Sequence, residues 1–348
     1  MHKTYKYLSA VWVLVLLTTV IAACTPKQES SAVVHLTGAT MGTHYNVKYV
    51  PSGKITPEKL QLEIDELLVH INKLMSTYDP NSELSQFNQW KSSDPFPLSP
   101  ETLTVMHEAI RLGVLSDNVL DVTVGPLVNL WGFGPKARPV KIPTDKLIEM
   151  TRERIGLDKL LLSDAAASKL NPDLYVDLST IAKGYGVDEI AVLLEKHQIT
   201  NYLAEIGGEM RVSGSKEDDQ AWRIAIEKPV TTERAVQRIL TIGNNAIATS
   251  GDYRNFYEEN GVRYSHLINP NTGYPIQHSL VAVSVVHPSC MVADGLATAI
   301  NVMGVEAGMA FAKKHNIAAL LISRENGEFK EYTTAEFEPY LPNTEQSY

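Results

Sequence analysis

The chain has 348 residues and a formal net charge of −9 at pH 7, from 40 acidic and 31 basic side chains. This length is ample for a large hydrophobic core, in one domain or in two closely joined lobes. The acidic balance argues against a nucleic acid as a partner, and a polyanionic ligand would need a cation close to it. With 2 cysteines, no Cys-x-x-Cys pair and no His-Glu-x-x-His motif, the sequence gives no indication of zinc.

The N-terminus has the pattern of a secretory signal peptide over residues 1–23. Lys3 and Lys6 precede an uncharged, mostly apolar run over 8–23 that ends in small residues. This run is shorter than the roughly 20 apolar residues that a membrane-spanning helix needs. We therefore expect the segment to be removed and not to span the membrane.

Cys24 directly follows Ile21-Ala22-Ala23, in a pattern that resembles the lipobox of bacterial lipoproteins, whose cysteine is lipidated and becomes the new N-terminus. The alternative is a plain signal peptide with an incidental cysteine. We favour the lipobox, and so expect a lipidated cysteine and flexible tether over 24–34, then a single domain over 35–348. The protein would be anchored in the bacterial cell envelope, on the outer or inner membrane, facing the periplasm. An acylated Cys24 would leave only Cys290 and hence no internal disulfide.

Two segments begin with the same helix-capping pattern, a Ser or Thr followed by a proline. Thr56 precedes Pro57, and Ser99 precedes Pro100. Ser or Thr caps the free N–H groups of a first turn, and proline is favoured at the first helical position. After Pro57, apolar residues recur at helical spacing over 60–75. Both segments are therefore predicted to be helices.

The later part of the chain is richer in strands. We expect a strand that ends near Leu178 and is followed by a helix, and a helix over 294–315 whose interior Gly304 and Gly308 soften. Further strands are expected in 201–214, 222–229, 266–269 and 280–286, and in a hairpin around Asn326-Gly327. Helices early and strands later favour an α+β (mixed α/β) fold class over a regular βαβ alternation.

The common nucleotide signatures are absent or fail in context. The segment WGFGPKA, residues 131–137, matches the Gly-x-Gly-x-x-Ala pattern of dinucleotide sites. It does not follow a strand, and Arg138-Pro139 prevents a helix from starting there, so we reject that interpretation. No GxxxxGK[ST] loop and no GxSxG elbow occurs in the sequence. Any ligand is bound at a less common kind of site.

The segment VDLSTIAKGYGVDE, residues 176–189, carries a first candidate site. Asp177 stands at the expected strand end, and Lys183 stands at the expected helix start, beside Gly184 and Gly186. An ammonium and free backbone N–H groups at a helix start suit a phosphate. The alternative is a strand–helix connection whose glycines serve only the turn.

Asp294 and Thr298 form a second candidate site. They are four residues apart on an expected helix, so their side chains lie on one face. Two oxygen ligands with room for carbonyls and waters suit Mg²⁺ better than a softer metal. The alternative is an acid that the helix dipole favours near the N-terminus, beside a threonine without a role.

His266 is a third candidate. It precedes the buried-looking pair Leu267–Ile268 and a turn over 269–273. From this stretch alone, a structural histidine with satisfied hydrogen bonds is the default interpretation. The nearby Tyr253-Arg254, after an apolar strand, is consistent with a ligand loop but equally with a plain turn.

Nine segments between Gly38 and Gly304 together resemble, in order, the blocks of the ApbE family, the FAD:protein FMN transferases or flavin transferases. They are GATMGTHYNV, LMSTYDPNSELSQFN, LDVTVGPLVNLWGFGP, VDLSTIAKGYGVD, EIGGEMRVSG, WRIAIEKP, IATSGDYRNFY, SHLINPNTGYPI and ADGLATAINVMG. Nine ordered blocks are far more specific than any single motif here. The resemblance implies a T-fold-like mixed architecture with FAD in a central cleft and one or two Mg²⁺ on its diphosphate.

The resemblance also implies site residues, carried over motif by motif. For FAD they are Met41 and Tyr78 at the flavin end, Val119, Leu120 and Asp121 along the cofactor, and Asp177, Lys183 and Ile268 around the remainder. For Mg²⁺ they are Thr180, through its main-chain carbonyl, with Asp294 and Thr298. Some members carry a second acid just before that last threonine, where this chain has Ala297, so we expect one Mg²⁺.

The family's reaction moves FMN from FAD onto a Thr or Ser hydroxyl of an acceptor protein and releases AMP. Such a transfer needs neutralisation of the diphosphate, which Mg²⁺ and Lys183 would supply, and a base for the incoming hydroxyl. His266, with an ordinary pKa of about 6.5, suits the role of base. The resemblance therefore changes our interpretation of His266 from structural to catalytic.

By family analogy, the acceptor is an exported segment of a redox membrane complex, such as a sodium-pumping NADH:quinone reductase or an Rnf-type complex. Two other functions stay open at this point. One is an FAD pyrophosphatase that gives FMN to water, and the other is a flavin-binding lipoprotein without enzymatic activity. Loss of Asp294 or Lys183 would favour the latter, and both are present.

Overall fold

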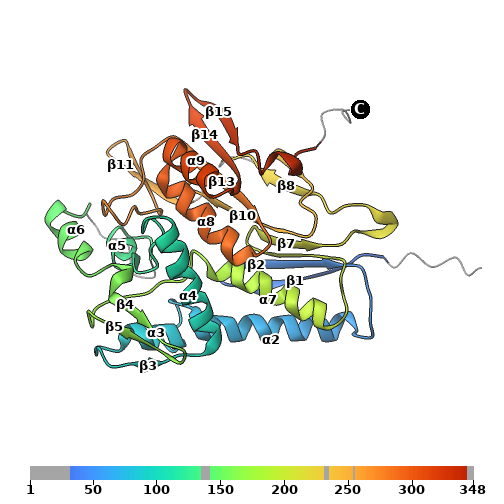
Figure 1. The fold of residues 1–348 in the computed structure, drawn as a ribbon, viewed down its shortest axis with the longest axis horizontal. Coiled ribbons are helices and arrows are strands. Elements are labelled where there is room, and N and C mark those ends of the chain that lie inside the picture. Colours follow the sequence, from blue (N-terminus) through green and yellow to red (C-terminus); the bar gives the residue numbers. More distant parts are fainter. Residues whose placement is uncertain (1–31, 135–141, 231–234, 254, 343–348) are drawn as a thin grey trace, which may run out of the picture. The chain divides into compact units, whose positions relative to one another are not determined.

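The computed structural model describes residues 32–134, 142–230, 235–253 and 255–342 (Figure 1). The predicted signal peptide, Cys24 and most of the predicted tether lie outside the described residues, and so does Arg254. The described residues from Val33 onward form one compact unit. Within the described ranges, no helix is both long enough and apolar enough to cross a membrane.

An eight-stranded antiparallel sheet is the frame of this unit, with the order β1-β2-β6-β7-β10-β13-β14-β15. Its strands are β1 (Val34–Thr40), β2 (Thr43–Tyr49), β6 (Tyr202–Ile206), β7 (Glu209–Ser213), β10 (Ala246–Gly251), β13 (Leu280–His287), β14 (Ala318–Glu325) and β15 (Glu328–Thr333). Successive side chains of a strand point to opposite faces. Ala246 and Ala248 accordingly belong to one hydrophobic core, and Ile247 belongs to another.

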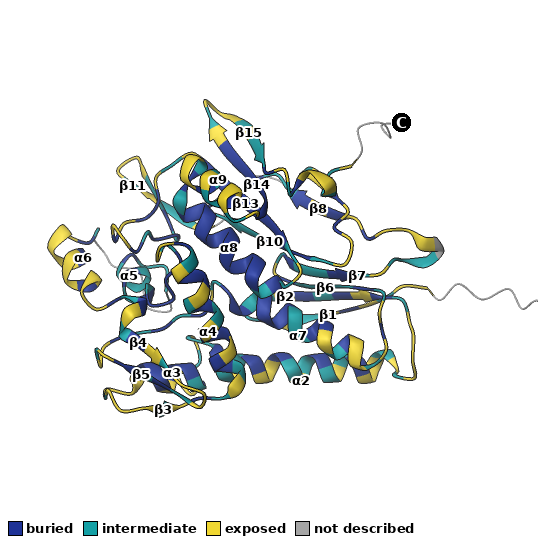
Figure 2. Ribbon diagram, in the orientation of Figure 1, coloured by how far each residue is buried: buried dark blue, intermediate teal, exposed yellow. Residues whose placement is uncertain are grey.

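Helices cover one face of the sheet and enclose the larger core. α2 (Pro57–Met75) packs on β1, α7 (Ala182–Lys196) on β6 and β7, and α8 (Cys290–Met303) on β10 and β13. The other face is covered by a two-stranded ladder of β8 (Ile224–Glu227) and β9 (Val236–Leu240). Figure 2 shows α8 buried along nearly its whole length. The polar Asp294 and Thr298 on α8 therefore lie inside the protein.

Both predicted helix starts are confirmed. The Thr56 hydroxyl accepts the N–H of Lys59, and the Ser99 hydroxyl accepts that of Thr102, so each satisfies a free donor of the first turn. Ser99 caps α4 (Pro100–Leu115). The remaining elements are α3 (Glu83–Gln89), α5 (Gly125–Leu130), α6 (Asp145–Arg152), α9 (Val305–Lys314), β3 (Phe96–Pro97), β4 (Leu160–Leu162), β5 (Ala166–Lys169), β11 (Phe256–Glu259), β12 (Val262–Ser265) and 3₁₀ turns at Leu157–Lys159, Glu217–Asp219 and Glu338–Tyr340.

The strand predicted to end near Leu178 does not form. Residues 174–178 have no regular secondary structure. The Val176 N–H donates to Asn88 Oδ1 and the Val176 carbonyl accepts from Asn88 Nδ2, each over 2.8 Å. A side-chain amide from α3 thus satisfies the backbone of Val176, while the next N–H, of Asp177, donates to the Val122 carbonyl over 2.7 Å. The apolar pattern alone cannot distinguish these contacts from pairing with a neighbouring strand.

The strand predicted over 266–269 is also wrong. β12 ends at Ser265, and Ile268 forms only an isolated bridge with Pro275. His266 therefore directly follows a strand. The other strand predictions are confirmed as the hairpins β6–β7 and β14–β15 and the strands β8 and β13.

The helix predicted over 294–315 is in fact two helices, α8 and α9. Gly304 separates them with a φ of 81°, a left-handed value that ends a helix. A Cβ on Gly304 would also approach His278 Cδ2 to 3.0 Å. α8 begins earlier than predicted, at Cys290, so Asp294 lies in its second turn and not at its start.

Candidate active site

A cleft of about 820 Å³ opens where the starts of α7 and α8, the β6–β7 turn, the end of β10 and the segment after β12 meet. Its volume lies within the ~300–1,000 Å³ typical of small-molecule pockets. The cleft brings together nearly all predicted site residues, namely Tyr78, Val119, Leu120, Asp121, Asp177, Thr180, Lys183, His266, Ile268, Asp294 and Thr298. These residues come from distant parts of the sequence, so the fold assembles the site.

Met41 does not belong to this lining. It occupies the two-residue turn between β1 and β2 with Gly42, where φ angles of 48° and 71° fit a tight hairpin. Its half-buried side chain packs on the large core, with Cε 3.1 Å from the position that a Cβ on Gly186 would take. Contact between Met41 and a ligand stays a prediction.

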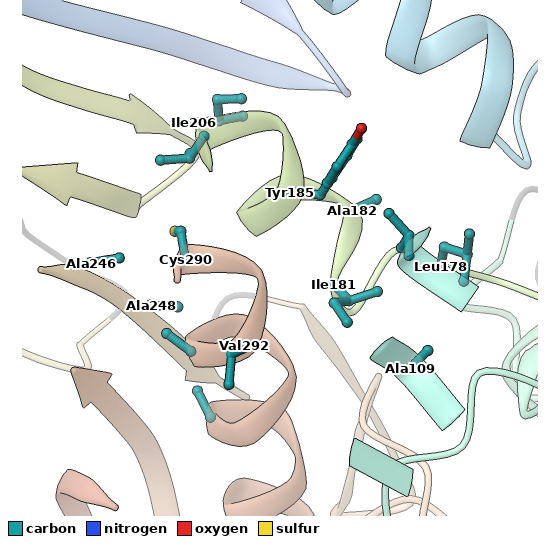
Figure 3. Packing of buried hydrophobic residues seen from close by; sticks show 14 of the residues in the cluster. Ala109, Leu178, Ile181, Ala182, Tyr185, Ile206, Ala246, Ala248, Cys290 and Val292 are labelled. Atoms are coloured by element: carbon teal, nitrogen blue, oxygen red, sulfur yellow. The ribbon is translucent and has the colours of Figure 1, made fainter. Parts of the chain in front are cut away.

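The floor of the cleft is a close approach of α7 and α8, whose packing Figure 3 shows around Cys290 and Ala182. A Cβ on Gly184 would stand 2.4 Å from the Cys290 carbonyl oxygen and 2.7 Å from Met291 Cα. The helices can approach this closely only because residue 184 has no side chain. At this distance, the Gly184 N–H donates to Asp294 Oδ2 over 3.1 Å. This glycine therefore places Asp294 beside the start of α7.

Lys183, the second residue of α7, contributes an ammonium to the same floor. Its Nζ lies 2.6 Å from Oε1 of Glu209, the first residue of β7. Burial lowers the pKa of Lys183, but the carboxylates of Asp294 and Glu209 outweigh burial and raise that pKa above its ordinary value. Burial raises the pKa of Asp294 to about 7, although the Lys183 ammonium opposes this change. The ammonium is therefore held charged between two buried acids.

Glu209 is a site residue that the sequence reasoning missed. Its side chain is 4 % exposed and lines the cleft, and its Oε2 is buried with no hydrogen-bond partner in the described part of the chain. The sequence feature that could have indicated Glu209 is the block EIGGEM, in which an acid follows two glycines. Gly207 and Gly208 adopt φ angles of 62° and 110°, which few other residues tolerate.

The three predicted metal ligands face the same cleft. Asp294 and Thr298 lie one turn apart on α8, with exposures of 5 % and 9 %. Thr180, just before α7, has a buried Oγ1 that lacks a partner within the described residues. Buried polar atoms of this kind normally have a partner, and a hard cation such as Mg²⁺ prefers oxygen ligands. The residues therefore fit Mg²⁺, through threonine oxygens and one carboxylate. Thr180 offers its hydroxyl in addition to the main-chain carbonyl that was predicted as the ligand.

No group of three or more His, Cys, Asp or Glu side chains among the described residues could hold a metal ion. A cation here would depend on threonine oxygens and on oxygens of the substrate itself. This arrangement is usual for Mg²⁺, which keeps several waters and binds through few carboxylates together with substrate phosphates.

His266 is oriented by a single main-chain carbonyl. The Asn255 oxygen accepts both the His266 main-chain N–H, over 3.2 Å, and Nδ1, over 3.0 Å. Since a carbonyl can only accept, Nδ1 carries the proton in the neutral ring, and Nε2 has a free lone pair. Burial lowers the pKa of His266, with a further decrease from the charge of Lys183. The Asn255 hydrogen bond opposes this decrease in pKa without cancelling it, so the neutral imidazole is favoured at physiological pH.

An aromatic column supports His266 from the side. The Phe133 ring lies edge-on to His266, with centroids 6.4 Å apart. Phe133 stacks on Tyr257 at 5.3 Å, Tyr257 on Tyr264 at 5.2 Å, and Tyr264 on Trp131 at 5.5 Å. Trp131 and Phe133 belong to the segment rejected as a dinucleotide motif. The described part of that segment forms a wall of the cleft, through Phe133 and Gly134.

The other predicted residues line the walls and the rim. One oxygen of Asp121 accepts the N–H and hydroxyl of Thr123, at 2.7 and 2.6 Å, and burial raises the pKa of Asp121. One oxygen of Asp177 accepts the N–H and hydroxyl of Ser179, at 3.0 and 2.5 Å. Tyr78 is 69 % exposed and lines the cleft, where a planar ligand could stack on it.

A charged lysine at a helix start, beside carboxylate and hydroxyl oxygens that fit a cation, is the arrangement that suits a phosphorylated ligand. The sequence matches the model of the ApbE family over residues 41–321. The chain therefore belongs to the ApbE family. The mixed α/β fold class expected from the resemblance is confirmed by the likeness to solved structures of that family.

Two curated relatives illustrate the similarity. The FAD:protein FMN transferase of Vibrio cholerae serotype O1 is 53 % identical over 322 residues, 92 % of this chain and 96 % of that protein. The FAD:protein FMN transferase of Escherichia coli K12 is 37 % identical over 319 residues, 90 % and 91 % of the two chains.

Solved structures of ApbE flavin transferases are similar to this chain over most of its length. The flavin transferase ApbE from Vibrio cholerae matches with a TM-score of 0.83 at 54 % identity, over 89 % of this chain and 99 % of that one. The apo form of the flavinyl transferase ApbE from Pseudomonas stutzeri matches with a TM-score of 0.82 at 37 % identity, over 89 % and 96 %. The similarity therefore extends over the whole fold and is not confined to one motif.

Proposed function

We propose that this chain is an FAD:protein FMN transferase, which moves FMN from FAD onto a Thr or Ser hydroxyl of an exported acceptor protein in a Mg²⁺-dependent reaction and releases AMP. The names of its relatives support the activity. The observation that carries the proposal is that Lys183, Asp294 and His266 line one cleft. They supply a positive charge for a diphosphate, an acid for a cation and a base for a hydroxyl, which phosphoryl transfer requires.

In the proposed step, the acceptor hydroxyl oxygen forms a bond to the phosphorus next to riboflavin. The bond from that phosphorus to the bridging oxygen breaks, and its electron pair leaves on the AMP phosphate. Nε2 of His266 takes the hydroxyl proton. The Nδ1 contact with Asn255 keeps Nε2 available and stabilises the imidazolium that forms.

The remaining groups neutralise and position the diphosphate. Lys183 would donate to its non-bridging oxygens as a compact charge. When bound, Mg²⁺ on Thr180, Asp294 and Thr298 would polarise the phosphoryl oxygens and stabilise the departing AMP. Tyr78, exposed at the cleft, is suited to cover the flavin ring. These roles are consistent with the positions of the residues along one continuous cleft.

The test is to incubate the purified protein with FAD, Mg²⁺ and an exported acceptor protein, and to follow the acceptor by intact-mass spectrometry. We expect a mass increase of one FMN on the acceptor and one equivalent of AMP. Release of AMP and FMN without any labelled acceptor would identify an FAD pyrophosphatase instead. Tight FAD binding without either product would identify a flavin-binding protein. Either result overturns the proposal.

We also propose that the protein is lipidated at Cys24 and acts in the bacterial cell envelope, facing the periplasm, on the outer or inner membrane. The signal peptide and lipobox patterns support this location. The acceptors would be exported subunits of redox complexes, such as a sodium-pumping NADH:quinone reductase or an Rnf-type complex. Comparison of FMN-labelled exported proteins in cells with and without this chain would identify them.

A further inference from the structure

The buried acid Glu209 has no role in the reaction as proposed, yet it holds the main charged group of the site. Its Oε1 lies 2.6 Å from Lys183 Nζ, and the two side chains are 4 % and 31 % exposed. Its Oε2 is buried with no hydrogen-bond partner among the described residues. A carboxylate this deeply buried is costly unless both its oxygens are used. The lysine engages only one of them.

A tight turn of the backbone fixes the position of Glu209. Glu209 is the first residue of β7 and directly follows the Gly207–Gly208 turn, whose left-handed backbone needs glycine. A Cβ on Gly207 would meet the Thr43 methyl at 2.9 Å and would lie 3.6 Å from Glu209 Oε2. The turn therefore holds the Glu209 carboxylate near Thr43, at the start of β2. Lys183, from α7, contacts the same carboxylate.

The charge balance of the floor is negative as a result. Lys183 is the only lysine or arginine among the described residues that line the cleft, and two buried acids close to it, Asp294 and Glu209, line the cleft as well. The charges of both Asp294 and Glu209 act on Lys183. A diphosphate would thus meet an ammonium that is already paired, in surroundings with an excess of carboxylates. Its binding would be opposed until a further positive charge arrived.

We infer that Glu209 is a positioning residue that makes the binding of FAD depend on a divalent cation. It pairs with Lys183 in the absence of ligand, so the lysine alone cannot hold the diphosphate. A cation bound beside Asp294 offsets the carboxylates, and Lys183 can then turn to the phosphate oxygens. This inference rests on the proposed function, because it takes the diphosphate of FAD as the ligand. It assigns Glu209 to binding control and not to the chemical step.

The test is to compare FAD affinity with and without Mg²⁺ in Glu209→Gln and wild type, by quenching of flavin fluorescence in chelator-treated buffer. We expect Glu209→Gln to bind FAD about tenfold more tightly than wild type without metal, the size of one partly screened charge interaction. With saturating Mg²⁺ the two affinities should converge. The ratio of affinities with and without Mg²⁺ should therefore fall in the variant.

Glu205→Gln is the matched control. Glu205 lines the same cleft, but its Oε2 accepts from Asn46 Nδ2 over 3.0 Å. We expect this variant to keep the Mg²⁺ dependence of wild type, because Lys183 stays paired. An equal effect of both substitutions would show that net charge alone matters and would overturn the role of Glu209. Unchanged metal-free affinity in Glu209→Gln would overturn it as well.

Glu209→Met, of similar length and without polar atoms, replaces Glu209→Gln if thermal melting shows that the glutamine variant is not folded. The same shift in metal dependence is expected, because both variants release Lys183. Failure of the proposed function is measured separately, by the absence of FMN transfer to an acceptor protein, and it leaves the Mg²⁺ dependence of FAD binding open to the same titrations. Failure of the inference leaves FMN transfer and wild-type FAD binding intact and makes the Glu209 variants indistinguishable from wild type in these titrations.

Discussion

At the scale of single residues, one hydrogen bond determines the tautomer of His266, the proposed base. The Asn255 carbonyl fixes the proton on Nδ1. Burial and the nearby Lys183 keep the pKa of the imidazole below its ordinary value of 6.5. The free Nε2 is therefore unprotonated over most of the physiological pH range.

We expect His266→Ala to lower the rate of FMN transfer by about 10²–10⁴-fold, the usual contribution of a general base. FAD affinity should change little, because the base acts on the acceptor and not on the diphosphate. Single-turnover transfer and FAD titration measure the two quantities separately.

The pH profile distinguishes a catalytic from a structural role. Because the pKa of His266 is lowered, the wild-type rate should stay constant at neutral pH and fall only as the pH drops below 6.5 and the imidazole is protonated. The residual activity of His266→Ala should lack this decrease. A variant rate close to that of wild type would instead leave His266 with a structural role.

Asp294 tests the cation site. Asp294→Asn keeps the shape of the side chain and an acceptor for the Gly184 N–H but removes the negative charge that Mg²⁺ requires. FMN transfer should be lost at ordinary Mg²⁺ concentrations, since Thr180 and Thr298 alone are neutral ligands. The melting temperature without ligand should stay close to that of wild type, and the added stability from FAD plus Mg²⁺ should vanish. Normal transfer at micromolar Mg²⁺ would place the metal elsewhere.

At the scale of secondary structure, the features that depend on neighbouring residues, such as helix starts, were predicted correctly from the sequence. Thr56 and Ser99 cap their helices as expected, because a capping hydroxyl and the helix it serves are adjacent in sequence. The strand predicted to end near Leu178 was wrong, because the backbone of Val176 is satisfied by the side chain of Asn88, which is distant in sequence. The break at Gly304 was missed, since glycine inside an apolar helical pattern is usually tolerated.

The close contact between α7 and α8 can be tested at Gly184, with Gly186 on the same helix as the control. In Gly184→Ala, the new Cβ would lie 2.4 Å from the Cys290 carbonyl, a backbone atom that cannot move aside. We expect a loss of about 1–3 kcal/mol in the free energy of unfolding, typical of overpacking. FAD binding should weaken with it, because Lys183 and Asp294 would move apart. Chemical denaturation and FAD titration measure the two effects.

Gly186→Ala is the matched control on the same helix. Its Cβ would meet only side-chain atoms, Ile206 Cδ1 at 3.0 Å and Met41 Cε at 3.1 Å. These can shift, and alanine favours a helix by about 1 kcal/mol over glycine, so the net change should be small. If both variants lost the same stability, the helix contact at Gly184 would have no special role.

At the scale of the whole molecule, the site was predictable only through ordered motifs. Asp294 and Thr298 could be paired from local spacing, as could Lys183 with its glycines. That these groups share one cleft with His266 and Tyr78 depends on long-range packing of α7, α8 and the sheet, which periodicity does not encode. Glu209 was missed for the same reason, because its importance lies in the contact with Lys183, on another element.

The location of the protein yields the last prediction. In Cys24→Ala the predicted lipid attachment site is removed, and with it about 0.8 kcal/mol of membrane affinity per buried methylene of each acyl chain. The variant should leave the membrane fraction, or keep its uncleaved signal peptide. The described residues that line the cleft begin at Thr37, so FMN transfer by the released protein should equal that of wild type. Cell fractionation followed by the transfer assay measures both properties.

Cys290→Ala controls for the loss of a cysteine as such. Cys290 is buried in the contact between α7 and α8 and forms no disulfide, so its removal cannot affect anchoring by a lipid. This variant should stay with the membranes and lose some stability through the small cavity it leaves. If Cys24→Ala, with its signal peptide cleaved, still sedimented with membranes at high salt, the anchor would have to be a protein contact. The lipobox interpretation would then be wrong, whereas the active site would stand unaffected.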